Sequence, residues 1–278
     1  MTYTPGPAWS RANKAKPFRN ADDGRDTAEN MREAHLLATR RMTAAVDKVP
    51  AARNSRYHVA ALLDNGEITD FDHRAPAELF LEDICANFAR GTLIATEQGP
   101  VAVEDLMPGD RVKTRDGNGA AIRWIGSCTL DGNALVAEDY PLRIKADALG
   151  ELRPVQDLIV GPRFRILTSH PGCAALFDSA EALAPVADLF DGDTIVRLRP
   201  PEDFEFFNLM CDGHQLIEAN GLDTETYHPG DYGVTVMSVE VQSHLRRLFP
   251  HLDGDLHRFG RTIRPVLKGF EAEALRYG

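Results

Sequence analysis

NFARGTLIATEQGPVAVEDLMPGDRVKTRDGNGAAIRWIG, residues 87–126, is the stretch of sequence that decides the fold. Short apolar runs in it alternate with turn signals at Gln98-Gly99-Pro100, Pro108-Gly109-Asp110 and Asp116-Gly117. Proline fixes its own φ and glycine adopts positive φ without steric cost, so these positions are typical of tight turns. The spacing therefore predicts several short strands joined by turns.

The same alternation continues to about residue 227. The exception is residues 180–189, for which we expect one or two helical turns. Turn signals this frequent, without regular helices between the strands, indicate a mainly β fold. The expected strands are Thr92–Thr96, Arg111–Arg115, Ala121–Ile125, Leu142–Lys145, Arg165–Leu167, Thr194–Leu198, Glu205–Met210, Gln215–Ala219 and Thr224–Tyr227.

Both flanks of this β region have a different pattern. Residues 1–26 are rich in proline and charge and predict a disordered tail. Residues 27–86 predict an N-terminal extension with a helix from about 27 to 47, a hairpin around Asp64-Asn65-Gly66, and a short helix or turn from Ala77 to Ile84. That hairpin could supply an extra strand to the edge of the β domain. The β domain itself would span residues 87–230, followed by a helical extension, residues 231–278, in which Val239–Leu248 has helical spacing.

Composition places the chain among globular proteins. Hydrophobic residues make up 43% of the 278 residues, enough for a sizeable core. The net charge of −11 argues against a nucleic-acid partner, because phosphate binding requires a positive surface. No run of 18 apolar residues is present, so no membrane span is expected. The N-terminus lacks the apolar segment of a secretory signal, so we expect a cytoplasmic protein or one exported without a cleaved signal peptide.

The spacing of cysteine and histidine gives little sign of a metal or a cofactor. No C-x-x-C pair is present, which excludes a zinc ribbon and a thioredoxin-like motif. A metal site built from His170, His214 and His228 is conceivable, but a structural role for each of them is the more common case. We therefore expect no metal and no cofactor. The four cysteines are Cys85, Cys128, Cys173 and Cys211.

Several short motifs between residues 87 and 230 form a recognisable pattern. They are Phe88-Ala89-Arg90-Gly91-Thr92, Ile94-Ala95-Thr96, Val103-Glu104-Asp105-Leu106, Pro108-Gly109-Asp110-Arg111-Val112, Trp124-Ile125-Gly126, Asp157-Leu158-Ile159-Val160-Gly161-Pro162, Phe206-Phe207-Asn208-Leu209 and His214-Gln215-Leu216-Ile217-Glu218-Ala219-Asn220-Gly221. With these motifs, residues 87–126 resemble the opening of a Hint domain, the fold shared by Hedgehog autoprocessing domains and inteins. The resemblance covers roughly residues 87–230 and looks like the bacterial type that stands alone behind a short N-terminal region. It implies a horseshoe of short β-strands.

The resemblance also implies a reaction. Active members of the family cut their own chain, or splice it, by an acyl shift. A Cys, Ser or Thr at the first residue of the domain attacks the carbonyl just before it, and the peptide becomes a thioester or an ester. A Thr-x-x-His element, about seventy residues later, strains and protonates the scissile amide.

This sequence departs from the family pattern where that chemistry would occur. The nucleophile position is Asn87, whose side-chain amide cannot form a thioester. In the Thr-x-x-His element, Gly161 stands in place of Thr and Phe164 in place of His, and a phenyl ring donates no proton. The His-Asn ending of inteins is absent after Asn220-Gly221, whereas His214 stands where related domains carry a histidine.

Three functional hypotheses follow. The first is a Hint domain with a degenerate active site, which serves as a structural or interaction module for an unidentified protein partner. The second is residual autoproteolysis near residues 84–88, with Cys85 as a displaced nucleophile on the same face of an extended strand as Asn87, and with His214 or His170 as proton donor. The third is a binding module for a ligand or a peptide. Its cleft would carry three residues near the mouth: His214, Asp212 and Arg163.

Overall fold

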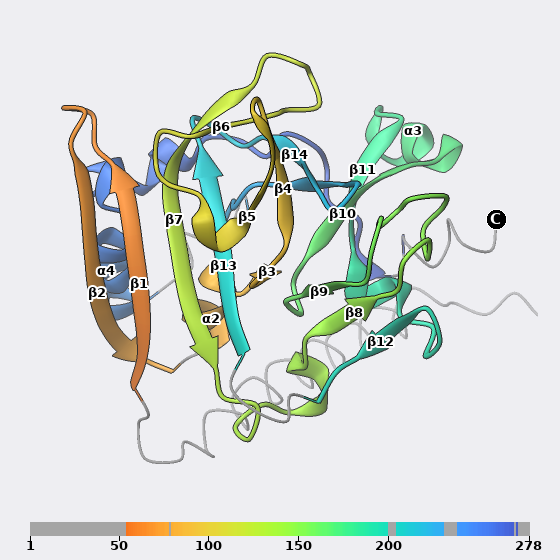
Figure 1. Ribbon diagram of the computed structural model, residues 1–278, viewed down its shortest axis with the longest axis horizontal. Coiled ribbons are helices and arrows are strands. Elements are labelled where there is room, and N and C mark those ends of the chain that lie inside the picture. Colours follow the sequence, from red (N-terminus) through yellow and green to blue (C-terminus); the bar gives the residue numbers. More distant parts are fainter. Residues whose placement is uncertain (1–53, 78, 200–203, 231–237, 270, 272–278) are drawn as a thin grey trace, which may run out of the picture. The chain divides into compact units, whose positions relative to one another are not determined.

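The computed structural model describes residues 54–77, 79–199, 204–230, 238–269 and 271. In this part of the chain the fold is mainly β, as predicted, and the named strands pair antiparallel in one sheet (Figure 1). The expected tail over 1–26 and the expected helix over 27–47 lie outside the described residues. Of the helices that the structure describes, none is both long and apolar enough to cross a membrane.

The strands are short, except in the hairpin and at the centre of the sheet. They are β1 (Asn54–Leu62), β2 (Ile68–Pro76), β3 (Phe88–Ala89), β4 (Leu93–Thr96), β5 (Gly99–Ala102), β6 (Arg111–Val112), β7 (Ala120–Leu130), β8 (Leu142–Ile144), β9 (Leu158–Val160), β10 (Arg165–Ser169), β11 (Glu181–Pro185), β12 (Ile195–Arg197), β13 (Phe204–Cys211), β14 (Leu216–Ala219) and β15 (Leu222–Glu225). The helices are α2 (Leu79–Cys85), α3 (Pro171–Phe177) and α4 (Val239–Leu248), and the 3-10 turns are η1 (Val103–Asp105), η2 (Ala137–Asp139), η3 (Val186–Leu189), η4 (Pro250–Leu252) and η5 (Leu256–Phe259).

The order of the strands explains the curvature of the sheet. Neighbours pair in the order β11-β10-β15-β14-β4-β6-β7-β13-β3-β9-β8-β12. The strands β9 and β10 therefore stand near opposite ends of the order, yet only residues 161–164 join them in the chain. The five steps from residue 160 to residue 165 span at most about 18 Å, so the sheet has to curl until its two ends face each other. This curl is the horseshoe that the family resemblance implies.

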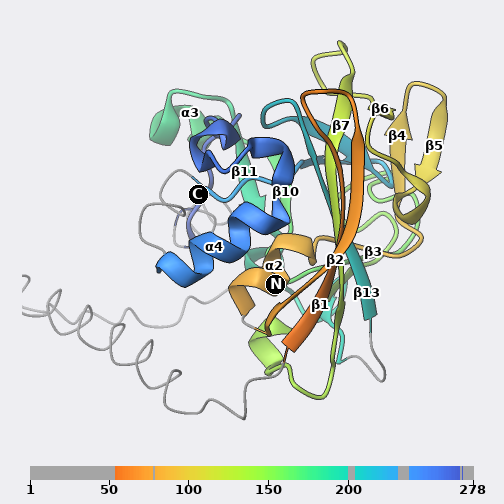
Figure 2. The same cartoon turned by 90° about the vertical axis from the view of Figure 1, so that its left-hand side faces the viewer.

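Alternation along the central strands divides the core into two clusters, because successive side chains of a strand point to opposite faces. On β13, Phe207 and Leu209 belong to one cluster, while Phe206 and Met210 belong to the other. Figure 2 shows α2 and α4 on one side of the long strands, with β4 and β5 on the other side. Each face of the strands is thus covered by a different set of elements.

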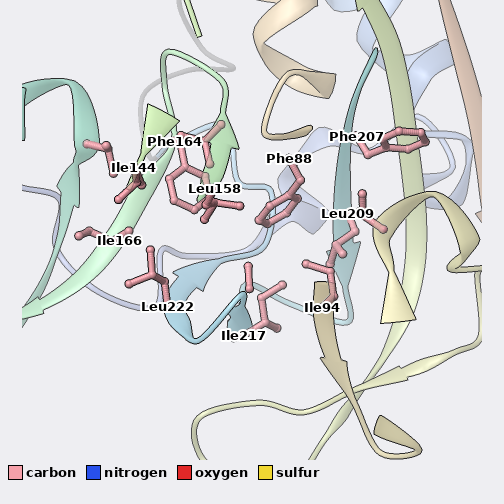
Figure 3. Close-up of a cluster of buried hydrophobic side chains, with 14 of the residues drawn as sticks. Phe88, Ile94, Ile144, Leu158, Phe164, Ile166, Phe207, Leu209, Ile217 and Leu222 are labelled. Atoms are coloured by element: carbon pink, nitrogen blue, oxygen red, sulfur yellow. The ribbon is translucent and has the colours of Figure 1, made fainter. Parts of the chain in front are cut away.

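Phe88 lies at the centre of the first cluster. Figure 3 shows its ring between Phe164 and Leu209, surrounded by aliphatic side chains from the facing strands. Phe88 and Phe164 are fully buried, and their ring centroids lie 5.7 Å apart with the planes at 77°. This edge-to-face contact is a favoured aromatic geometry, and it ties β3 to the segment that precedes β10.

The second cluster is completed by segments outside residues 87–230. The hairpin predicted around Asn65-Gly66 is confirmed, since β1 pairs with β2, and β1 also pairs with β7 and so extends the sheet. On the predicted helix α4, Leu245 and Leu248 are buried in this cluster. The indole Nε1 of Trp124 donates a hydrogen bond to the Leu248 carbonyl at 2.6 Å. The hairpin and α4 are therefore part of one packed unit with the β region.

The prediction for residues 180–189 is wrong for its first half. Glu181–Pro185 form the strand β11 against β10, and only Val186–Leu189 make a turn of 3-10 helix. Consecutive residues 182–184 are buried, and periodicity cannot distinguish such a strand from a helix. The helix α3 was not predicted, because its N-cap is His170 rather than one of the usual capping residues.

Candidate functional site

A cleft of about 720 Å³ lies where the curled sheet brings distant segments together. Its walls come from α2, from Asn87, from Pro162 and the two arginines that follow it in sequence, from Asn208 on β13 and from residues 225–229. Ligand pockets in proteins typically have volumes of about 300–1,000 Å³, so this cleft has the size of a binding site.

The chain enters the cleft where α2 ends. The helix stops at Cys85, and two residues later Asn87 lines the cleft. The side-chain Nδ2 of Asn208 donates to the Ile84 carbonyl at 2.8 Å, and the backbone N–H of Gly161 donates to the Asn87 carbonyl at 2.9 Å. These bonds hold the backbone on both sides of the position that the resemblance assigns to the nucleophile. Among the described residues, no group is hydrogen-bonded to the side-chain amide of Asn87.

Gly161 packs directly on the peptide bond that precedes Asn87. A Cβ atom at residue 161 would lie 1.7 Å from the Ala86 carbonyl oxygen and 2.7 Å from its carbonyl carbon. Both distances are far below any real Cβ contact, and the obstacle is backbone rather than a flexible side chain. Glycine is therefore required here by the close approach of two backbone segments. No other residue fits at 161 without moving residues 86–87.

Phe164, the second residue of the degenerate element, does not reach the cleft. It is fully buried in the first core cluster, with its ring against Phe88. Its backbone N–H donates to the Gly161 carbonyl at 3.2 Å, which closes the turn between β9 and β10. The two positions thus have local structural roles, one as a backbone contact and the other as core.

Two arginines line the cleft two residues apart, and each pairs with a carboxylate through its Nε atom. Arg163 Nε lies 3.1 Å from Asp83 Oδ2, and Arg165 Nε pairs with Glu225 Oε1. Burial raises the pKa of Asp83 to about 6, because the loss of solvation outweighs the attraction of Arg163. In each pair the shortest contact is made by Nε, and within the part of the chain that the structure describes no hydrogen bond is donated by an Nη atom of either arginine.

His214 lies behind Glu225 and is fully buried. Its Nδ1 accepts a hydrogen bond from the Ile263 N–H at 3.0 Å, so the proton of the neutral ring is on Nε2. That Nε2 lies 2.9 Å from Glu225 Oε2, although the contact lacks hydrogen-bond geometry. The His214 ring stacks at a centroid distance of 4.8 Å on His228, which does line the cleft. His214 therefore supports the wall of the cleft and does not reach its surface.

Two other residues proposed from the sequence lie elsewhere. The Nδ1 atom of His170 caps α3 by accepting a backbone N–H, and His170 does not line the cleft. The carboxylate of Asp212 pairs with Arg123 at 3.4 Å, also away from the cleft. Of the three residues expected near the mouth of a binding cleft, only Arg163 lines it.

The expected geometry of Cys85 is wrong. Cys85 is the last residue of α2, so it does not share the face of an extended strand with Asn87. Its side chain is fully buried in the second core cluster, next to Gly126 and close to Cys128. The interaction with Cys85 and burial raise the pKa of the Cys128 thiol. The helix extends to this residue because Leu81, like Cys85 one turn later, is buried against the same cluster.

Sequence reasoning missed most polar residues of the cleft, which are Asp83, Arg165, Asp188, Asn208, Glu225 and Thr226. For Arg165 the only signal was its place at the start of a predicted strand, since Arg163 lies in the turn that precedes β10 and strand alternation does not apply to it. For Asp83 and Glu225 there was none, because their arginine partners are distant in sequence and only the curl of the sheet brings them together.

Comparison with known proteins assigns a family to this chain. Residues 85–231, 147 of the 278 residues, match the family model described as the Hint domain. The fold is similar to the solution structure of a bacterial intein-like domain from Clostridium thermocellum, with 12% identity, 51% of this chain and 99% of that chain covered, and a TM-score of 0.33. It is also similar to the crystal structure of the MchDnaB-1 intein, with 14% identity, 50% and 99% covered, and a TM-score of 0.28. No curated protein matches. The chain belongs to the Hint domain family.

Proposed function

We propose that this Hint domain does not cleave its own chain, and that it acts as a structural or interaction module. The observation that carries the proposal is the contact of Gly161 with the Ala86 carbonyl. In active members of the family this carbonyl is attacked, and a Thr side chain occupies the position of Gly161. Here the backbone of residue 86 fills the space that such a side chain would need. A Thr side chain that would strain the amide therefore does not fit at this position.

The other two family positions support the same proposal. Asn87 offers an amide, which is a weak nucleophile and gives no thioester. Phe164 is buried in the core and offers no proton, and the side chain of His214 is buried and does not line the cleft. A nucleophile added at residue 87 would therefore find no proton donor for the leaving amine.

The Asn87→Cys variant tests this proposal. We expect it to remain at full mass when incubated with a strong thiol, because a cysteine alone supplies neither strain nor a proton at the amide. Intact-mass spectrometry measures the outcome, and Asn87→Ala serves as the matched control for the loss of the amide. Efficient thiol-dependent cleavage before residue 87 in the cysteine variant would refute the proposal.

A residual autoproteolytic activity led by Cys85 remains the second candidate function. It has a nucleophile close in sequence to the junction, but the burial of that thiol beside Cys128 and Gly126 argues against it. Attack requires near-ideal placement, and an error of about 1 Å can cost a hundredfold in rate. This candidate predicts fragments that end near residues 84–88 and that disappear in Cys85→Ala. Fragments that persist in Cys85→Ala would exclude it.

A further inference from the structure

The cleft holds two cationic side chains whose best hydrogen-bonding atoms are unused. Arg163 and Arg165 each turn the Nε atom toward a carboxylate of the protein, and among the described residues no hydrogen bond is donated by their Nη atoms. The ion pairs with Asp83 and Glu225 thus orient the two guanidinium groups and leave four nitrogen atoms to bind something else. Oriented donors of this kind recognise planar anionic groups in two-point contacts.

The side chains of the two arginines differ in solvent exposure. Arg163 lies at the surface of the cleft, and Arg165 lies deeper. The Arg163 side chain is 65% exposed, whereas that of Arg165 is 19% exposed. An arginine that is partly desolvated loses water from its Nη atoms, so a ligand that supplies acceptors there regains those hydrogen bonds. Hydrogen bonds from a ligand should therefore stabilise Arg165 more than Arg163. Arg163, which is more exposed, is the group that an entering ligand contacts first.

The charges around the cleft limit the kind of anion. The positive charges of Arg163 and Arg165 are matched by the negative charges of Asp83 and Glu225, and the carboxyl group of Asp139 is close enough to interact with Asp83 and Arg163, so the site has no excess positive charge to hold a dianion. Asp188 also lines the cleft, but it is exposed, where solvent and salt screen its charge. A single negative charge on a planar group fits the geometry better than a phosphate does.

The walls beside the arginines are apolar. Phe80 and Ile84 of α2 contribute to this apolar lining, together with Ala187, Tyr227, Val266 and three prolines. A ligand that fills the cleft would place an apolar group there, and the burial of apolar area would add to its affinity. The three prolines are Pro162, Pro185 and Pro229.

We infer that the cleft is a binding site for a carboxylate that carries an apolar group, held by the Nη atoms of Arg163 and Arg165. The inference rests on the proposed function, since it assigns the cleft to a ligand rather than to cleavage of the chain. The terminal carboxylate of a peptide and a free small carboxylic acid share this chemistry. Both would present two oxygen atoms to the guanidinium groups and an apolar side group to Phe80 and Val266.

Titration calorimetry on the full-length protein tests the inference with defined probes. These are N-acetyl-Ala-Ala-Phe with a free carboxylate, the same peptide as a C-terminal amide, 3-phenylpropionate and inorganic phosphate. We expect the free acid to bind at least ten times more tightly than the amide, and phosphate not to bind. Equal affinity for 3-phenylpropionate and the peptide acid would identify a small carboxylate as the ligand class, and tighter binding of the peptide would identify a chain terminus. Equal binding of acid and amide, preference for phosphate, or no binding of any probe would overturn the inference.

Variants locate the site. For whichever probe binds, Arg163→Gln should lower the affinity by about tenfold. Arg163→Lys should also lower it, because an ammonium group lacks the two-point geometry of a guanidinium. The matched control is Arg111→Gln, since Arg111 is an exposed arginine that pairs with Glu97 outside the cleft. Unchanged affinity in Arg163→Gln, or an equal loss in the control, would contradict the assignment. Intact mass measured on the same samples separates the two proposals: cleavage would refute the proposed function, while lost or non-selective binding by an intact chain refutes only this inference.

Discussion

At the scale of single residues, the contact at Gly161 shows how a backbone can take the place of a side chain. The Ala86 carbonyl lies so close that a Cβ atom could not be added at 161 without a shift of one segment. The backbone that leads to this carbonyl is held by two hydrogen bonds: Asn208 Nδ2 donates to the Ile84 carbonyl at 2.8 Å, and the Ala86 N–H donates to the Glu82 carbonyl at 2.9 Å. Restoring a side chain at 161 would therefore disturb the junction rather than rebuild a catalytic group.

Gly161→Ala should lower the free energy of unfolding by about 2–3 kcal/mol, the usual scale of a forced steric overlap in a packed region. Chemical denaturation measures the change. Gly269→Ala is the control, because a Cβ there would meet its nearest atoms, those of Asp188, at 3.7 Å or more. If Gly161→Ala were no less stable than this control, the close approach that we describe would be wrong.

His251 is a second residue whose environment has a measurable consequence. It is buried, neither ring nitrogen has a hydrogen-bond partner among the described residues, and burial lowers its pKa to about 4. The ordinary pKa of histidine is about 6.5, so below that pH the unfolded chain binds a proton that the folded chain does not. This residue therefore contributes stability above pH 6.5 that is lost as the pH falls toward 4, about 3 kcal/mol in full.

His251→Leu should flatten the dependence of stability on pH between 6.5 and 4.5. The matched control is His257→Leu, which changes an exposed histidine in the next turn of the chain. Thermal unfolding of both variants and of the unchanged protein, followed over this pH range, measures the effect. A slope in His251→Leu as steep as in the unchanged protein would show that this histidine is not held neutral by the fold.

Sequence alone located the residues of the family positions but not their surroundings. The resemblance assigned three family positions, at Asn87, Gly161 and Phe164, because the sequence around each of them matches a family motif. The contacts of these residues could not be predicted, since the space at residue 161 depends on the Ala86 carbonyl, which follows the end of α2. For Cys85 the assumed extended strand was wrong because helical packing against the second cluster decides its direction.

At the scale of elements, the hairpin and the C-terminal helix complete the β region. The strand β1 pairs with β7 over residues 57–61, and Tyr57 and Val59 are fully buried in the second cluster. From the other end of the chain, α4 buries Leu245 and Leu248 in the same cluster. The Asn-Gly turn predicted the hairpin and helical spacing predicted α4, but neither pattern states which surface an element will cover.

A chain cut to residues 85–231, the part that matches the family, should therefore not fold into the same structure. It would lose β1, β2, α4 and most of α2, and would expose the face of β7 and β13 that carries Trp124 and Phe206. Dispersion of amide signals in two-dimensional NMR measures the outcome, with residues 52–278 as the control chain. A well-dispersed spectrum of the shorter chain that matches the longer one would contradict this role of the flanking elements.

At the scale of the whole described unit, one short connection determines where the cleft forms. Residues 161–164 join strands from opposite ends of the paired order, so the sheet curls and brings Arg163 and Arg165 to Asp83 and Glu225. Short strands and frequent turns were enough to predict a mainly β fold, and the motifs were enough to predict the horseshoe. The partners across the cleft could not be predicted, because they are separated by about sixty to eighty residues and no local pattern links them.

The measurement that tests the central claim most directly is intact-mass spectrometry of the freshly purified full-length protein, with and without a strong thiol. The account predicts a single species at the full mass under both conditions, because residues 87, 161 and 164 supply no nucleophile, no strain and no proton. Two fragments that join between residues 84 and 88, and that increase with thiol, would contradict it. Such fragments would show that an acyl shift still takes place at this junction.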